Sequence, residues 1–145
     1  MIFGRRKRVM NRLLIVEDEP LVAFDNEHFL SDAGFEVAGT VDTVADALAM
    51  IRDPGVDLVL ADMRLSDGGT GIDVARAARD RGTPVLFVTG ACPPEARALA
   101  VGCLAKPYSQ RDLLAAIEAV EARVEGKPPK RVPRGLTLFD GDVAA

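Results

Sequence analysis

The chain has 145 residues, of which 48% are hydrophobic and 28% are charged, and its net charge is −4. This length and composition fit one folded domain and exclude a broadly disordered protein. No apolar run reaches the ~18–20 residues of a membrane-spanning helix, and no apolar stretch follows the basic start as in a secretory signal. Two cysteines and one histidine exclude a disulfide framework and a His-rich metal site. We therefore expect a cytoplasmic protein without a membrane partner.

The charge is unevenly distributed along the chain. Residues 1–12 carry five basic residues and no acid, and residues 126–135 carry four basic residues and no acid. The segment 13–125 has 9 basic and 20 acidic residues, which gives −11, and residues 136–145 add −2. A body this acidic is a poor surface for nucleic acid, so we expect no contact with DNA.

Strand and helix signals alternate along the chain. The apolar run 13–16 predicts a strand buried on both faces. A helix is expected over 20–33, because proline suits a first helical turn. A weak strand signal at 36–39 precedes a helix that Asp42 or Thr43 can cap. The remaining elements, in chain order, are a buried strand over 57–61, an alanine-rich helix over 72–80, a buried strand over 85–88, a short helix over 94–100, a strand over 101–105 and an amphipathic helix that begins after Ser109.

This alternation predicts a doubly wound α/β fold, in which five helices cover both faces of a five-stranded parallel sheet. We expect three parts: a basic N-terminal extension over 1–11, one domain over 12–125, and a proline-rich basic tail over 126–145. The stretch GLTLFDG near the end could add a short docked strand or could be disordered, and both alternatives stay open.

Polar residues follow four of the predicted strands. Glu17 and Asp18 end the first, Asp62 the third, Thr89 the fourth and Lys106 the fifth. The carboxyl ends of parallel strands share one edge of the sheet, where sites form in open α/β folds. Carboxylates that are brought together repel one another, and a hard cation such as Mg²⁺ resolves the repulsion. With an ammonium and a hydroxyl beside the metal, the edge suits a phosphoryl group.

The stretches LLIVEDEP, DLVLADMRL, VLFVTG and LAKPY together resemble the receiver domain of two-component response regulators, the CheY-like family. The resemblance implies the strand order 2-1-3-4-5 and a cis peptide bond between Lys106 and Pro107. It also implies a sensor histidine kinase or a phosphotransfer protein as partner. The implied phosphoacceptor is Asp62, and the implied contacts to the phosphoryl group come from Thr89 and Lys106. The implied Mg²⁺ site consists of Glu17, Asp18, Asp62 and the backbone carbonyl of Arg64.

The chain departs from the common receiver pattern at several positions. Cys103 stands where many receivers have an aromatic residue three positions before the lysine, and Ser66 replaces a frequent proline. The stretch PVLFVTG, the glycine-rich loop SDGGTGID and the missing aromatic together resemble the FAT GUY group of alphaproteobacterial single-domain receivers. That resemblance implies kinases of the HWE/HisKA2 type and a role in general stress signalling, as a phosphate sink or a relay.

The expected function is therefore a stand-alone, monomeric or weakly dimeric phosphoacceptor that signals by protein contact and is not an enzyme in the ordinary sense. An alternative is a pseudo-receiver that binds partners without phosphorylation. An FMN-binding flavodoxin-like protein would need a Ser/Thr/Gly-rich phosphate loop after the first strand, where EDEP stands instead. A Mg²⁺-dependent phosphatase would need a second aspartate where Arg64 stands.

Overall fold

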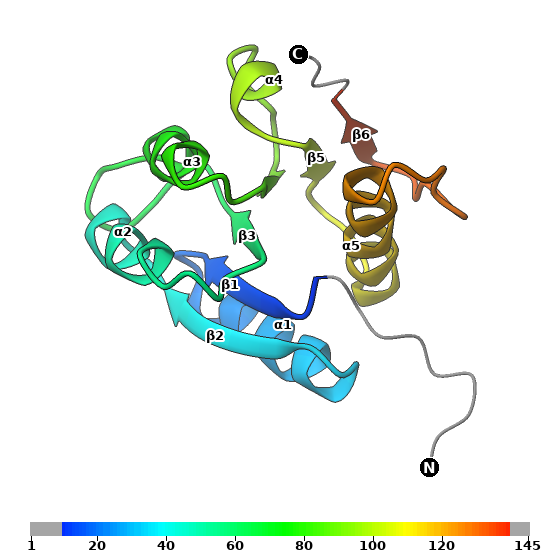
Figure 1. Ribbon diagram of the computed structural model, residues 1–145. Coiled ribbons are helices and arrows are strands. Elements are labelled where there is room, and N and C mark those ends of the chain that lie inside the picture. Colours follow the sequence, from blue (N-terminus) through cyan, green and yellow to red (C-terminus); the bar gives the residue numbers. More distant parts are fainter. Residues whose placement is uncertain (1–9, 140–145) are drawn as a thin grey trace.

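The computed structural model describes residues 10–139, so most of the basic N-terminal extension and the last six residues lie outside the described part. A single six-stranded sheet runs through this part between two layers of helices (Figure 1). Buried side chains of α1 and α5 pack on one face, and those of α2, α3 and α4 pack on the other. No helix of residues 10–139 is long and apolar enough to cross a membrane.

The helices and strands follow the predicted order with small changes at their ends. The elements are β1 (Arg12–Val16), α1 (Pro20–Asp32), β2 (Glu36–Val41), α2 (Val44–Ile51), β3 (Leu58–Ala61), α3 (Gly71–Asp80), β4 (Val85–Thr89), α4 (Ala96–Leu99), β5 (Gly102–Ala105), α5 (Gln110–Val124) and β6 (Leu136–Leu138).

The strand order is β2-β1-β3-β4-β5-β6, so the expected order of the five parallel strands is confirmed. The prediction of a five-stranded sheet is wrong by one strand, because β6 pairs antiparallel with β5. The stretch that the sequence left open thus forms a docked strand. Three residues are too few for a periodic signal, and what makes them a strand is their pairing with a distant edge.

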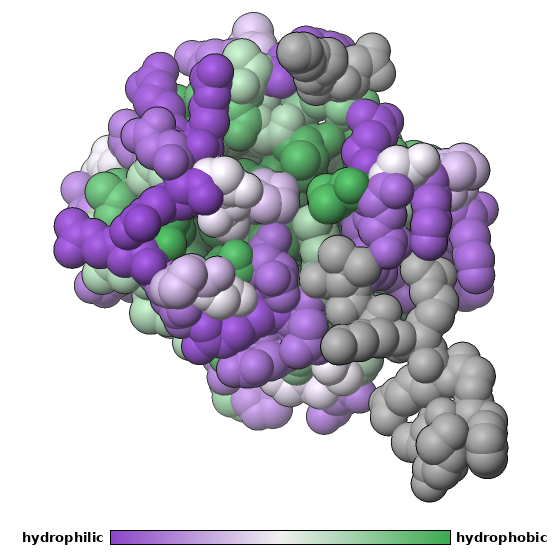
Figure 2. Space-filling view, in the orientation of Figure 1, coloured by the Kyte–Doolittle hydropathy of each residue, from purple (hydrophilic) through white to green (hydrophobic). Residues whose placement is uncertain are grey.

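Each central strand supplies side chains to both cores, which explains its continuous apolar run. In β1, Leu13 and Ile15 belong to the cluster under α1 and α5, while Leu14 and Val16 belong to the cluster under α2, α3 and α4. Burying one such side chain contributes roughly 1.5–3 kcal/mol. On the face shown in Figure 2, hydrophilic residues cover the outer helices and hydrophobic residues gather between the two layers.

Side-chain caps begin three of the helices. Of the two candidates before α2, Thr43 is the cap, and its hydroxyl accepts from the Asp46 amide at 3.0 Å. Ser109 caps α5 as predicted, accepting from the Asp112 amide. A capping box formed by Thr70 and Asp73 starts α3, and the sequence pattern TGID could have shown it.

Candidate functional site

Three carboxylates meet at the carboxyl ends of β1 and β3. Glu17 and Asp18 follow β1, Asp62 follows β3, and one oxygen from each lies within 4.8 Å of the others. Glu17 and Asp62 are buried, with 5% and 9% of their surface exposed. The structure therefore brings together the acidic side chains that the strand ends predicted.

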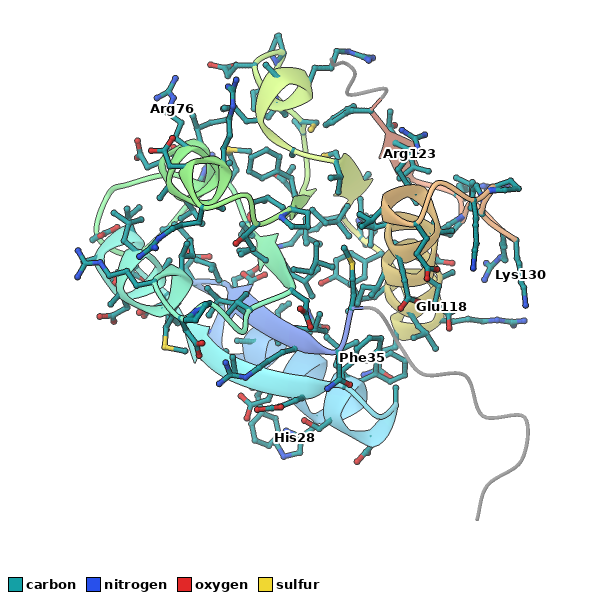
Figure 3. The ribbon with its side chains drawn as sticks, viewed as in Figure 1. His28, Phe35, Arg76, Glu118, Arg123 and Lys130 are labelled. Atoms are coloured by element: carbon teal, nitrogen blue, oxygen red, sulfur yellow. The ribbon has the colours of Figure 1, made fainter. Side chains whose placement is uncertain are left out.

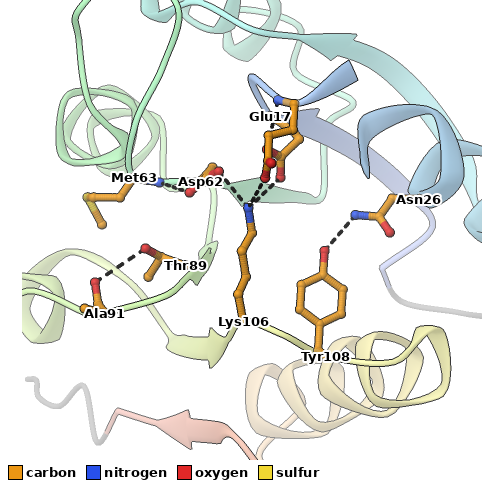
Figure 4. A network of polar contacts seen from close by, with 9 residues as sticks. Glu17, Asn26, Asp62, Met63, Thr89, Ala91, Lys106 and Tyr108 are labelled. Carbon is orange, nitrogen blue, oxygen red and sulfur yellow. Dashed lines mark hydrogen bonds and ion pairs between the residues drawn. The ribbon is translucent and has the colours of Figure 1, made fainter. Parts of the chain in front are cut away.

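Lys106 places its ammonium inside this acidic cluster (Figure 4). Its Nζ lies 2.8 Å from Asp62 Oδ2, 3.2 Å from Glu17 Oε1 and 3.3 Å from Glu19 Oε1. Burial alone would lower the pKa of Lys106, but the hydrogen bond to Asp62 and the charges of Glu17 and Asp62 outweigh it and raise the pKa above its ordinary value. The Lys106–Pro107 peptide bond is cis, as expected. The contact with Glu19 was not predicted, although this third acid is visible in the run EDE.

Glu17 is the most perturbed carboxyl group of the cluster. Burial, followed by its contact with Asp62, raises the pKa of Glu17 to about 7, against the lowering effects of the Glu19 amide and Lys106. The Glu19 amide donates to Glu17 Oε2 at 3.1 Å. Burial and the neighbouring Asp62 thus disfavour a charged Glu17 even with one lysine present.

Asp62 is held by the backbone around it. Its amide donates to the Val16 carbonyl at 2.9 Å, and the Met63 amide donates to Asp62 Oδ1 at 2.6 Å. The start of α3 presses against the Asp62 carbonyl, since a Cβ at Gly71 would overlap this oxygen and approach Phe87 to 3.1 Å. Gly71 is a positioning residue that the sequence reasoning missed, because its close neighbour is apparent only after folding.

Thr89 ends β4 beside the cluster and is 6% exposed. Its hydroxyl donates to the Ala91 carbonyl at 3.4 Å, and its own carbonyl accepts from the Lys106 amide at 2.9 Å. The hydroxyl therefore has a weak bond to its own loop, and this bond can be exchanged for another acceptor at small cost.

Arg64 lies in the glycine-rich loop after β3. The residue pairs with Thr70 in an isolated antiparallel bridge, and its side chain is exposed. Asp67 fastens the loop to α2, accepting from the Val44 amide at 3.0 Å and the Gly69 amide at 3.1 Å. The metal contact expected from the Arg64 carbonyl stays a prediction.

Tyr108 extends the polar network behind the lysine. Its hydroxyl accepts from Asn26 Nδ2 of α1 at 2.8 Å (Figure 4). Burial raises the pKa of Tyr108 above its ordinary value, and the Asn26 bond opposes that shift. This pair links α1 to the loop that carries Lys106, and the sequence alone did not indicate it.

Comparison with known proteins agrees with this geometry. The family described as response regulator receiver domain matches residues 13–118. The chain belongs to the response regulator receiver domain family. The phyllosphere-induced regulator PhyR of Methylorubrum extorquens is 37% identical over 81 residues, which cover 53% of this chain and 30% of that protein. The transcriptional regulatory protein PdtaR of Mycobacterium tuberculosis is 31% identical over 142 residues, or 94% of this chain and 64% of that protein.

Solved receiver structures are similar in fold. The solution structure of SdrG from Sphingomonas melonis superimposes with a TM-score of 0.66 at 36% identity, covering 77% of this chain and 96% of that one. The response regulator PhyR from Brucella abortus gives a TM-score of 0.59 at 35% identity, covering 72% of this chain and 44% of that one. The receiver chain thus corresponds to less than two thirds of PhyR and of PdtaR, and to nearly all of the SdrG structure.

Proposed function

We propose that this receiver is a phosphoacceptor that takes a phosphoryl group from a sensor histidine kinase, or from a phosphotransfer protein, onto Asp62 with Mg²⁺ bound. The observation that carries the proposal is the convergence of Glu17, Asp18 and Asp62 around the ammonium of Lys106. Thr89 adds a weakly held hydroxyl at the same edge.

The donor set fits Mg²⁺. Three carboxylates supply oxygen ligands only, which a hard cation of this size prefers. Glu17, Asp18 and Asp62 would hold the ion, with the carbonyl of Arg64 as a further ligand. When bound, Mg²⁺ supplies positive charge that offsets the charge on the transferred phosphoryl oxygens.

The chain's own residues position the nucleophile and neutralise charge. An Asp62 carboxylate oxygen attacks the phosphorus of a phosphohistidine, the new O–P bond forms, and the N–P bond breaks with its electron pair on the imidazole. Lys106 Nζ, now 2.8 Å from Asp62 Oδ2, is placed to pair with a phosphoryl oxygen. Thr89 can turn its hydroxyl from the Ala91 carbonyl to another phosphoryl oxygen. The product is an acyl phosphate.

The partner surface that we propose includes the exposed side of α1. Leu21 and Phe24 are 79% and 59% exposed, and the helix that carries them begins two residues after Asp18. The Phe24 ring also contacts His28, with the ring centroids 4.1 Å apart. Apolar side chains beside the acidic cluster suit the helices of a kinase that must bring its phosphohistidine to Asp62.

The finer assignments rest on resemblance. The likeness to PhyR proteins, one of which is described as an anti-anti-sigma factor from Bartonella quintana, supports a role in general stress signalling. Partner kinases of the HWE/HisKA2 type are proposed from the resemblance to the FAT GUY group. We propose that the chain acts in the cytoplasm as a monomer or weak dimer, without DNA contact. It would signal by protein contact or drain phosphate from a kinase, as in the FAT GUY group.

Phosphotransfer profiling tests the proposal. The 145-residue chain is mixed with purified, radiolabelled histidine kinases, beside an Asp62→Asn variant and an Asp32→Asn control on the exposed end of α1. The wild type and the control should take up label that hydroxylamine removes, and Asp62→Asn should take up none. Label that resists hydroxylamine, or label on Asp62→Asn, would contradict the proposal. Kinase binding without any transfer would favour the pseudo-receiver.

A further inference from the structure

The segment after α5 returns to the sheet and closes its β5 edge. The strand β6 runs antiparallel to β5, with Leu136 opposite Leu104 and Leu138 opposite Gly102. Leu136 is buried, whereas the side chain of Thr137 is exposed. In Figure 1 the strand lies beside β5 and α5, at the far edge of the sheet from β2.

Phe139 anchors this segment. The residue is 6% exposed and belongs to the same apolar cluster as Cys103 of β5 and Ala96 of α4. Its amide donates to the Val101 carbonyl at 2.9 Å, and its carbonyl accepts from the Arg123 guanidinium, which lies beside β6 in Figure 3. The Arg97 guanidinium of α4 lies 5.3 Å from the ring centroid. Phe139 thus adds an aromatic ring to the apolar cluster that contains the cysteine at the usual aromatic position.

The absence of a side chain at Gly102 lets β6 approach β5 closely. A Cβ at this position would lie 2.8 Å from the Thr137 carbonyl oxygen and 3.4 Å from a Leu138 methyl carbon. Both close neighbours belong to β6. Because the backbone of Gly102 is not in the left-handed region, an alanine there would disturb the docking of β6 and little else.

The same segment is joined to the phosphoacceptor site through one residue. The carbonyl of Gly135 accepts from the Ala105 amide at 2.9 Å. The next residue is Lys106, whose amide bonds to Thr89 and whose Nζ bonds to Asp62. A second route runs from Phe139 to α4, which follows the loop that begins at Thr89.

The segment has the structure of a unit that opens locally. Its strand has only three residues, and the stretch that joins it to α5, KPPKRVPRG, is rich in proline and basic residues. Such a piece can detach at a much lower free energy than that of global unfolding, because its removal leaves both main cores largely in place.

We propose that residues 135–139 form a strap that covers the β5 edge, opens as a unit, and opens more often when the site holds a phosphoryl group. The linkage to the site rests on the proposed function, whereas the strap itself does not. When a phosphoryl group draws Thr89 and Lys106 towards it, the loop after β4 and the end of β5 shift, and the slot of Phe139 between α4 and β5 fits the ring less well.

Opening uncovers a surface with a defined chemistry. The Ala105 amide and the Val101 carbonyl lose the partners that the strap supplies, and β5 becomes an open strand edge beside an apolar slot that held an aromatic ring. An exposed edge of this kind pairs readily with an extended segment of another chain. A closed strap prevents that pairing, and an open strap permits it.

The strap is tested first without any phosphoryl group. Hydrogen exchange is measured on the 145-residue chain, with Gly102→Ala and Phe139→Ala beside Thr137→Ala as the control at an exposed position. The amides of Ala105 and Phe139 should exchange faster in the first two variants only, while the Glu36 amide at the opposite edge, bonded to the Asn11 carbonyl, keeps its rate. Combining the two substitutions should add little to either alone.

Two results would contradict the proposal that residues 135–139 open as a unit. One is acceleration at Glu36 equal to that at Ala105 and Phe139, which would mean that the segment opens only with the whole domain. The other is a concentration-dependent dimer of the wild type in which residues 136–139 pair with β5 of a second copy, detected by mixed-isotope nuclear magnetic resonance.

The linkage is tested with Mg²⁺ and beryllium trifluoride, a phosphoryl analogue. The analogue should accelerate exchange at Ala105 and Phe139 by roughly 5–150-fold, the usual range of coupling between two sites. By reciprocity, Gly102→Ala should bind the analogue more tightly, by up to the same factor when its strap is fully open. Unchanged or slower exchange with the analogue bound would overturn the linkage. Failure of the wild type to bind the analogue would overturn the proposed function and the linkage. Hydrogen exchange of Gly102→Ala without the analogue would still test whether the strap opens as a unit.

Discussion

The Lys106 ammonium lies 2.8 Å from Asp62 Oδ2 and also contacts two glutamates, so one cation offsets the charge of several carboxylates. The side chain of Lys106 is 21% exposed and that of Asp62 is 11% exposed, which makes this ion pair largely shielded from water. A lysine in this position would compete with a bound Mg²⁺ for the same oxygens, and its ammonium could donate to a phosphoryl oxygen as a new partner.

Replacing this lysine should affect stability and metal binding in opposite directions. In Lys106→Met, the carboxylates lose their counter-ion, so the metal-free protein should be less stable by about 1–3 kcal/mol. Mg²⁺ should bind more tightly than to the wild type, because no ammonium competes for the oxygens. Chemical denaturation and isothermal calorimetry measure the two effects, with Lys130→Met at an exposed position as control. Weaker Mg²⁺ binding by Lys106→Met would contradict this account.

Asp18 should be the acidic residue whose replacement acts mainly on the metal. Asp18→Asn would remove one of the proposed charged oxygen ligands. Since losing an outer partner of a metal site costs about 10–100-fold in affinity, losing a ligand should cost at least that much. The wild type should gain ~2.7 kcal/mol of stability at a Mg²⁺ concentration 100 times its dissociation constant. Thermal unfolding with and without Mg²⁺ measures both, and Asp32→Asn should behave as the wild type. Equal Mg²⁺ stabilisation of Asp18→Asn would exclude Asp18 as a ligand.

Gly71 should be required for the position of Asp62. In Gly71→Ala, the new Cβ overlaps the Asp62 carbonyl oxygen, so α3 or the end of β3 must shift, at a cost of roughly 1–3 kcal/mol. Phosphotransfer to Asp62 should slow, because the carboxylate moves with its backbone. Gly90→Ala is the matched control, since a Cβ at Gly90 meets nothing within 4 Å. Normal stability together with normal transfer in Gly71→Ala would show that the contact can relax freely.

The titration of the Tyr108 hydroxyl reports on the polar network behind the site. The chain has one tyrosine and no tryptophan, so absorbance near the phenolate band reports this side chain alone. Burial is the largest cause that raises the pKa of Tyr108, the Asn26 bond lowers it, and Glu17, Lys106 and Asp62 act on it through their charges. The midpoint of the Tyr108 titration should lie above 10.0, the ordinary pKa of a tyrosine, and Asn26→Leu should raise this midpoint further.

The sign of the stability effect follows from linkage. Above pH 10 the unfolded phenol loses its proton while the folded phenol keeps it, so the folded state binds more protons and the stability falls as the pH rises. A Tyr108 midpoint at or below that of the urea-unfolded chain would show that the hydroxyl is not buried in solution.

Much of the fold was predictable because its signals are local. The apolar residues of β1 pack into both cores, and the sequence signal for this is a run of four consecutive apolar residues. The caps Thr43 and Ser109 lie within three residues of the amides that they bind. Other features had weaker local signals. The helix expected over 94–100 spans only Ala96–Leu99. The capping box of α3 has its pattern in the sequence, as TGID, but one such four-residue pattern is a weak signal.

By itself, the sequence determined which residues stand at the ends of the parallel strands, and a parallel sheet brings such ends to one edge. Tertiary structure alone decided what these residues touch: Lys106 contacts Glu19 as well as Asp62, Gly71 presses on the Asp62 carbonyl, and β6 closes the edge of β5. Those contacts join residues far apart in the chain, and their strength depends on fit and shielding from water, which are properties of the packed molecule and have no local signature in the sequence.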